Sequence, residues 1–100
     1  MNSVVESNLT EIKDVMRSYG VVRAYLFGSA ANGNMSDDSD VDFMVTFNPE
    51  LSYTDYGNNY FKLIYALQTL LKKDVDIVAE ETITNPYLLK RINSQKIAVL

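Results

Sequence analysis

The stretch from Asp40 to Phe47 constrains the fold most, because its large apolar residues recur at every second position. Residues that alternate along a β-strand point to opposite faces of the sheet. The opposite face carries Asp40 and Asp42, so the sequence predicts a strand that holds two carboxylates on one side. The apolar face, which should pack on the core, consists of Val41, Phe43, Val45 and Phe47.

Patterns typical of helices and of strands alternate along the rest of the chain. Apolar residues recur at helical spacing from Val5 to Tyr19, and Gly20 should end this helix. Ser3 and Glu6 have the spacing of a capping box at its start. We therefore expect a single α/β (α+β) domain over residues 1–100, a small mixed β-sheet with helices packed mainly on one face. The other expected elements are a strand over 21–27, a helical turn over 30–32, a helix over 56–71, a strand over 75–78, a helix after Asn85-Pro86 and a strand over 96–100.

The composition excludes several kinds of chemistry. The chain has no cysteine and no histidine, which rules out disulfides, thiolate zinc sites, thiol nucleophiles and imidazole acid–base catalysis. Its net charge of −4 argues against a nucleic-acid partner. No apolar run is long enough to span a bilayer, and residues 1–10 lack the pattern of a signal peptide. We therefore expect a cytoplasmic protein that contacts no membrane.

Two chemical features are joined by one loop. The close carboxylates of Asp40 and Asp42 would repel each other unless a cation binds between them or one stays protonated. Mg²⁺ is the fitting cation, because it takes carboxylate and phosphate oxygens together. Gly28 and Ser29 follow the preceding strand, where a glycine lets the backbone approach a ligand and a serine supplies a hydroxyl and an N–H group. The residues thus predict a phosphate site beside a metal site.

This pattern resembles a known family signature. Gly-Ser, ten residues and Asp-x-Asp, here GSAANGNMSDDSDVD, is similar to the signature of the DNA polymerase beta-like nucleotidyltransferase superfamily. The short chain resembles the minimal nucleotidyltransferases that are often encoded beside a HEPN-domain protein. The resemblance implies a fold like the palm of that polymerase and a third carboxylate on a later strand. Asp76, flanked by apolar residues, fits that position better than Asp74, which adjoins two lysines.

The resemblance also implies a role for each residue. Gly28 and Ser29 would hold the terminal phosphates of ATP, while Asp40 and Asp42 would bind two Mg²⁺ ions. Asp76 would complete the metal site nearer the acceptor and help to orient or deprotonate the attacking hydroxyl. These roles amount to in-line displacement at the α-phosphorus, with pyrophosphate as the leaving group.

The sequence departs from the family pattern after Gly-Ser. Relatives commonly carry arginine there, whereas this chain has Ala30 and Asn32. The difference leaves three interpretations open: weaker nucleotide binding, a phosphate contact from another residue or from a partner, or lost activity. Asn32 itself is an open candidate for a hydrogen bond to a phosphate. Lys90 and Arg91 are further candidates for the missing phosphate contact, but we expect them to lie on a solvated helix face.

Two further groups of residues have simpler expected roles. Asp37 and Asp38 should be solvated loop residues, not ligands. The tyrosines of the second long helix should pack in the core and not stack on bases, because their spacing is helical. They are Tyr53, Tyr56, Tyr60 and Tyr65.

The function that follows is Mg²⁺-dependent transfer of AMP from ATP to a hydroxyl of a partner protein. By resemblance, the partner is a HEPN-type toxin and the chain its antitoxin. Two alternatives remain: a binding subunit that neutralises its partner by contact alone, and a transferase acting on a small molecule such as an antibiotic. Nucleic-acid polymerisation is the least expected activity because of the net charge of −4. Both homo- and hetero-oligomers are compatible with the sequence.

Overall fold

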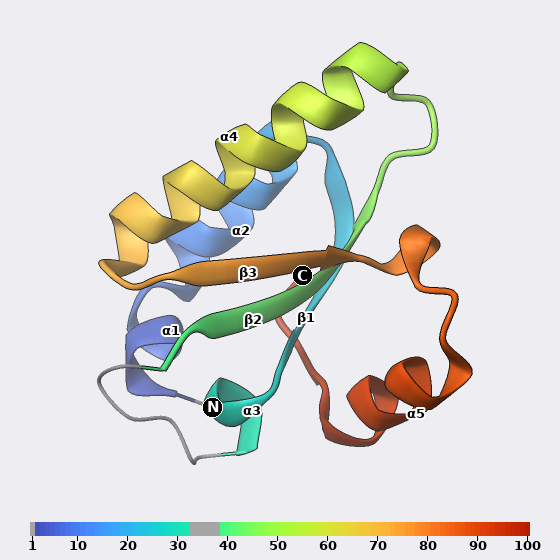
Figure 1. Cartoon of the computed structure of the whole chain (residues 1–100). Helices are drawn as coiled ribbons and strands as arrows, with labels where there is room; N and C mark the ends of the chain where they lie inside the picture. The colour runs from blue at the N-terminus through green and yellow to red at the C-terminus, as the bar shows by residue number, and fades with distance from the viewer. Residues whose placement is uncertain (1, 33–38) are drawn as a thin grey trace.

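A mixed four-stranded β-sheet forms the centre of the computed structural model, which describes residues 2–32 and 39–100 (Figure 1). The strand order is β3-β2-β1-β4. β1 pairs antiparallel with both β2 and β4, whereas β2 pairs parallel with β3. The mixed sheet expected from the sequence is therefore confirmed. The strands are β1 (Val21–Phe27), β2 (Val41–Phe47), β3 (Val75–Ala79) and β4 (Ile97–Ala98).

Most helices pack on one face of this sheet, as expected. The core on that face contains the apolar side of β2 together with Ile12 of α2 and Leu63 and Leu67 of α4. Figure 1 shows α2 and α4 together on that side and α5 on the other. The helices are α1 (Ser3–Ser7), α2 (Leu9–Ser18), α3 (Ser29–Asn32), α4 (Tyr53–Leu71), the 3₁₀ helix η1 (Glu80–Thr82) and α5 (Pro86–Gln95).

The second face of β2 is less polar than its sequence indicates. Met44 follows Asp42 on that face, yet its side chain is fully buried. Its neighbours in register are Tyr25 and Val78. Ile92 of α5 is also buried and, like Met44, lies outside the main core cluster. Apolar side chains are therefore buried on both faces of the sheet, and α5 lies on the second face.

The prediction of one continuous helix from Val5 to Tyr19 is wrong. The helix is interrupted at Asn8, whose backbone has φ −111° and ψ 16°. The Asn8 side-chain amide donates to the carbonyl oxygen of Val4 at 2.8 Å, and such local bonds compete with a continuing helix. The N-cap is Asn2 and not Ser3, because its Oδ1 accepts from the N–H of Val4 at 2.8 Å.

The expectation that the tyrosines of α4 pack in the core holds for only two of them. Tyr56 packs on Phe47, with ring centroids 4.9 Å apart, and Tyr60 donates its hydroxyl to the carbonyl oxygen of Ile77 at 2.6 Å. Tyr53, the first residue of the helix, is 99% exposed and Tyr65 is 72% exposed. Tyr65 lies two residues from Leu63 and from Leu67, and so about 200° from each around the helix.

Within the described residues, no helix combines the length and the apolar character that crossing a membrane would require.

Candidate active site

Three neighbouring strands bring the predicted acidic residues together. In the register of the sheet, Asp42 lies beside Phe27 of β1 on one side and beside Asp76 of β3 on the other. Residues directly opposite in a ladder share a face of the sheet. Asp76 is therefore the acid that meets Asp42, whereas Asp74 lies before the start of β3. Asp40 immediately precedes β2 and is exposed.

The electrostatics of Asp42 reflect this crowding. Burial raises the pKa of Asp42 to about 6, helped by the negative charges of Asp76 and Asp40 and by a side-chain hydrogen bond with Asp76. Burial and like charge both disfavour the ionised form. The three predicted carboxylates thus interact, and a hard cation would relieve their repulsion.

The carboxylates are not gathered into a preformed cage. Among residues 2–32 and 39–100, no three acidic side chains lie close enough together to form a ready-made metal site. Asp42 and Asp76 nonetheless fit a divalent ion chemically, since they are paired carboxylates, one of them desolvated.

Gly28 lies directly against this acidic pair. Its φ is +71°, and a Cβ built on it would lie 2.5 Å from Oδ2 of Asp42. The positive φ would strain a residue with a Cβ, and the Asp42 carboxylate leaves no room for that atom, so glycine is strongly favoured at this position. The chain then enters α3, where Ser29 is partly buried and the N–H of Ala31 donates to the carbonyl oxygen of Gly28 at 3.1 Å. The turn between β1 and α3 is thereby held against the carboxylate.

Ala30 and Asn32 are the positions at which the family resemblance leads us to expect arginine. Ala30 is fully buried in the core, so its side chain is not directed at a ligand. The side chain of Asn32 and the residues Asp37 and Asp38 lie outside the described part of the structure, and the expectations for them stay predictions.

A pocket of about 260 Å³ opens between this turn and α5. The sheet side contributes Phe27, Gly28 and Asp42 to its lining. Arg91 is exposed, as expected for a solvated helix face, and it also lines this pocket. The remaining lining residues are Leu88, Ile92 and Gln95, also from α5. The spacing of Leu88 and Ile92 was the signal available in the sequence, since it places Arg91 beside the apolar side of the helix.

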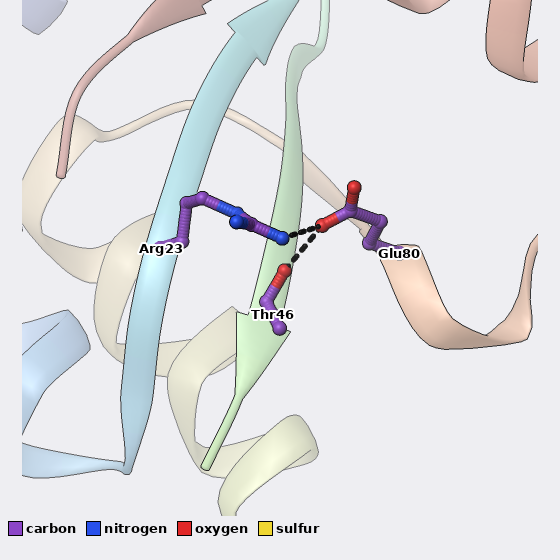
Figure 2. A network of polar contacts seen from close by, with 3 residues as sticks. All are labelled: Arg23, Thr46 and Glu80. Carbon is purple, nitrogen blue, oxygen red and sulfur yellow. Dashed lines mark hydrogen bonds and ion pairs between the residues drawn. The ribbon is translucent and has the colours of Figure 1, made fainter. Parts of the chain in front are cut away.

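A second polar cluster lies on the same face at the opposite end of the strands. Figure 2 shows Arg23 and Thr46 pointing toward the same oxygen of the Glu80 carboxylate. Its Oε2 accepts from Thr46 Oγ1 at 2.5 Å and from Arg23 Nη2 at 2.9 Å. The hydrogen bond from Thr46, followed by that from Arg23, lowers the pKa of Glu80. The Glu80 carboxylate is hydrogen-bonded by both Arg23 and Thr46. This cluster therefore fastens η1 to the sheet and is not a second acidic site.

Comparison with known proteins identifies the family. The family model described as a nucleotidyltransferase domain matches residues 9–99. The chain belongs to the nucleotidyltransferase domain family. This nucleotidyltransferase is 36% identical over 99 residues to a protein of Methanocaldococcus jannaschii named as a candidate protein adenylyltransferase, covering 91% of this chain and 97% of that protein. The nucleotidyltransferase is therefore an enzyme of the transferase class.

Solved structures agree with this assignment. A structure described as a candidate minimal nucleotidyltransferase is 30% identical and superposes with a TM-score of 0.79, covering 97% of this chain and 95% of that one. A chain from a Shewanella oneidensis complex of a tri-AMPylated HEPN toxin with an MNT antitoxin has a TM-score of 0.68 at 22% identity, covering 95% and 71%. The polymerase beta-like fold and the resemblance to minimal nucleotidyltransferases are thus confirmed.

Proposed function

We propose that this nucleotidyltransferase uses Mg²⁺ to transfer AMP from ATP to a hydroxyl group of a HEPN-type toxin, and so acts as its antitoxin. The observation that carries the proposal is the pairing of Asp42 with Asp76 across two strands, with Gly28 against the carboxylate of Asp42. Paired carboxylates beside a turn without a Cβ suit a ligand that brings both phosphates and cations.

Asp40, Asp42 and Asp76 would hold the metal ions. Bound Mg²⁺ supplies positive charge that stabilises the entering and leaving oxygens at the α-phosphorus. Gly28 leaves room for phosphate oxygens close to the backbone, and Ser29 offers its N–H and hydroxyl to them. Asp76 is exposed on β3, at the edge of the sheet, where an acceptor from outside can reach it.

The transfer balances without any further reagent. The acceptor hydroxyl oxygen forms a bond to the α-phosphorus, the bond from that phosphorus to the bridging oxygen breaks, and pyrophosphate leaves. The proton of the hydroxyl passes to the carboxylate of Asp76. Because no histidine is present in the chain, a carboxylate is the appropriate base.

Two observations favour a protein as the acceptor. Asp76, placed nearest the acceptor, is exposed on the edge strand β3, so a hydroxyl presented by another protein can reach it. The relative from Methanocaldococcus jannaschii is named for protein adenylylation, and the Shewanella oneidensis complex pairs an MNT antitoxin with an AMPylated HEPN toxin.

The test is transfer of label from [α-³²P]ATP to the neighbour-encoded HEPN partner in the presence of Mg²⁺. We expect labelling by the wild type and a loss of at least about 100-fold in Asp42→Asn, since a metal-binding carboxylate is removed. Asp74→Asn is the matched control. Asp74 is an exposed carboxylate two residues before Asp76, and it is not paired with Asp42 in the sheet. No labelling by the wild type, or equal labelling by Asp42→Asn, would refute the proposal.

Neutralisation by contact alone is the second candidate, favoured by the buried Ala30 at a position where the family resemblance leads us to expect arginine. The double variant Asp40→Asn, Asp42→Asn separates the two. If cells expressing the toxin still grow with this variant, contact is sufficient. If they stop growing while the complex still forms, chemistry is required.

A further inference from the structure

α5 presents a mixed stripe to the sheet. Leu88, Arg91, Ile92 and Gln95 have the i, i+3, i+4, i+7 spacing of one helix face, and all four line the pocket beside Gly28 and Asp42. Ile92 is 2% exposed and fixes this face against the sheet, while Leu88 is 41% exposed at the rim. Arg91 lines the pocket while remaining exposed, so its guanidinium is accessible to a ligand that enters from solvent.

The charge of Arg91 is not paired with an acidic side chain among the described residues. Its guanidinium makes no hydrogen bond or ion pair to any residue in the described ranges, where the one salt bridge joins Arg23 to Glu80. The opposite wall of the pocket carries Asp42, with Asp76 next to it. The pocket therefore has an acidic wall and a basic wall with a turn containing Gly28 between them.

A polyphosphate with bound Mg²⁺ matches this polarity. Its metal ions would face the carboxylates, and phosphate oxygens on its other side would face the guanidinium. Arginine suits that role because its planar fork donates two parallel hydrogen bonds to phosphate oxygens. Lys90, one residue earlier, is not part of the pocket lining.

We propose that Arg91 binds the terminal phosphates of the nucleoside triphosphate, supplying from α5 the contact that the turn after Gly28-Ser29 lacks. The inference rests on the proposed function, since it assumes that the pocket takes a nucleotide. It adds a positioning residue that lies 62 positions beyond Ser29 in the sequence.

The experiment is calorimetric titration of the purified wild type, Arg91→Gln and Lys90→Gln with Mg²⁺–ATP and with Mg²⁺–pyrophosphate. Loss of a charged hydrogen-bonding group should raise the Kd of Arg91→Gln for both ligands about 10-fold to 100-fold. Lys90→Gln removes the same charge from the same helix turn outside the pocket and should stay within about 2-fold of wild type. Arg91→Lys should recover part of the affinity.

The outcomes distinguish nucleotide binding by the protein from the role of Arg91 in that binding. Absence of Mg²⁺–ATP binding by the wild type overturns the proposed function and this inference with it. Wild-type binding that is unchanged in Arg91→Gln overturns the inference alone, as does an equal loss in Lys90→Gln. A loss for ATP without a loss for pyrophosphate would place Arg91 at the nucleoside and would also overturn it. Unchanged melting of the free variants shows that the loss is not one of folding.

Discussion

At the scale of single residues, Gly28 and Asp42 restrict each other. The Gly28 backbone has φ +71°, and a Cβ there would lie 2.5 Å from the Asp42 carboxylate. The Gly28→Ala variant must therefore bear left-handed strain and displace the partly buried carboxylate of Asp42. We expect it to lower the free energy of unfolding by about 1 to 3 kcal/mol and to abolish transfer. Urea denaturation measures the first effect and the labelling assay the second.

Gly57 provides the matched control for this substitution. It lies inside α4, and a Cβ built on it meets nothing within 4 Å. Alanine is a better helix former than glycine, so Gly57→Ala should raise the free energy of unfolding by about 0.5 to 1 kcal/mol. Equal destabilisation by both variants would show that the contact with Asp42 is not the cause.

The raised pKa of Asp42 makes the metal-free protein sensitive to pH. Its folded-state pKa of about 6 lies above the ordinary value of 3.8, so the folded chain holds this proton more tightly than the unfolded chain does. This contribution is fully present below about pH 4 and is lost as pH rises through 6. In EDTA, the melting temperature should fall across this range by on the order of 5 °C. Asp42→Asn should lose this part of the pH dependence, and a wild-type profile in that variant would contradict the assignment.

Sequence reasoning at this scale found the acids and named Arg91 only as the less favoured candidate for a phosphate contact. Asp40 and Asp42 are two positions apart in the chain, and Asp76 stands out as an acid between apolar residues. These signals are local. The spacing of Leu88 and Ile92 places Arg91 beside the apolar side of α5, but its position next to Gly28 depends on how α5 packs on the sheet, which is a tertiary contact.

At the scale of elements, strands were predicted more accurately than helix ends. β1 has the expected bounds, and β2 begins one residue after the expected Asp40, because apolar side chains at alternate positions mark the extent of a strand. α4 begins three residues before the expected Tyr56, because Ser52 Oγ accepts from the N–H of Asp55 at 3.1 Å and so caps an earlier turn. Caps and the break at Asn8 depend on single side-chain hydrogen bonds, which apolar periodicity does not reveal.

The cap of α5 links helix stability to ligand binding. Oδ1 of Asn85 accepts from the N–H groups of Tyr87 at 2.9 Å and Leu88 at 3.3 Å. Asn85→Ala should lower the free energy of unfolding by about 1 kcal/mol. Because α5 carries Arg91, Mg²⁺–ATP affinity should also fall. Asn93→Ala, a change at an exposed position of the same helix, should leave the free energy of unfolding and the affinity unchanged within error. Equal losses in this variant would show that the cap is not the cause.

At the scale of the whole molecule, a chain of 100 residues has limited stability of its own, so ligand binding should shift its melting strongly. The carboxylate repulsion around Asp42 opposes folding at neutral pH until a cation binds. A ligand at about 100 times its Kd adds about 2.7 kcal/mol, which corresponds to a rise on the order of 10 °C. We expect this rise with ATP and Mg²⁺ together in a thermal-shift measurement.

Each component alone provides the control for that measurement. ATP without Mg²⁺ should give little or no rise, because the carboxylates of Asp42 and Asp76 repel the triphosphate. Mg²⁺ alone should raise the melting temperature by less than the pair does, since phosphate oxygens would complete its coordination. Asp42→Asn should respond weakly to the pair. An equal rise with ATP alone would mean that the nucleotide binds away from the carboxylates of Asp40, Asp42 and Asp76. The packing of three strands around Asp42 would then play no part in nucleotide binding.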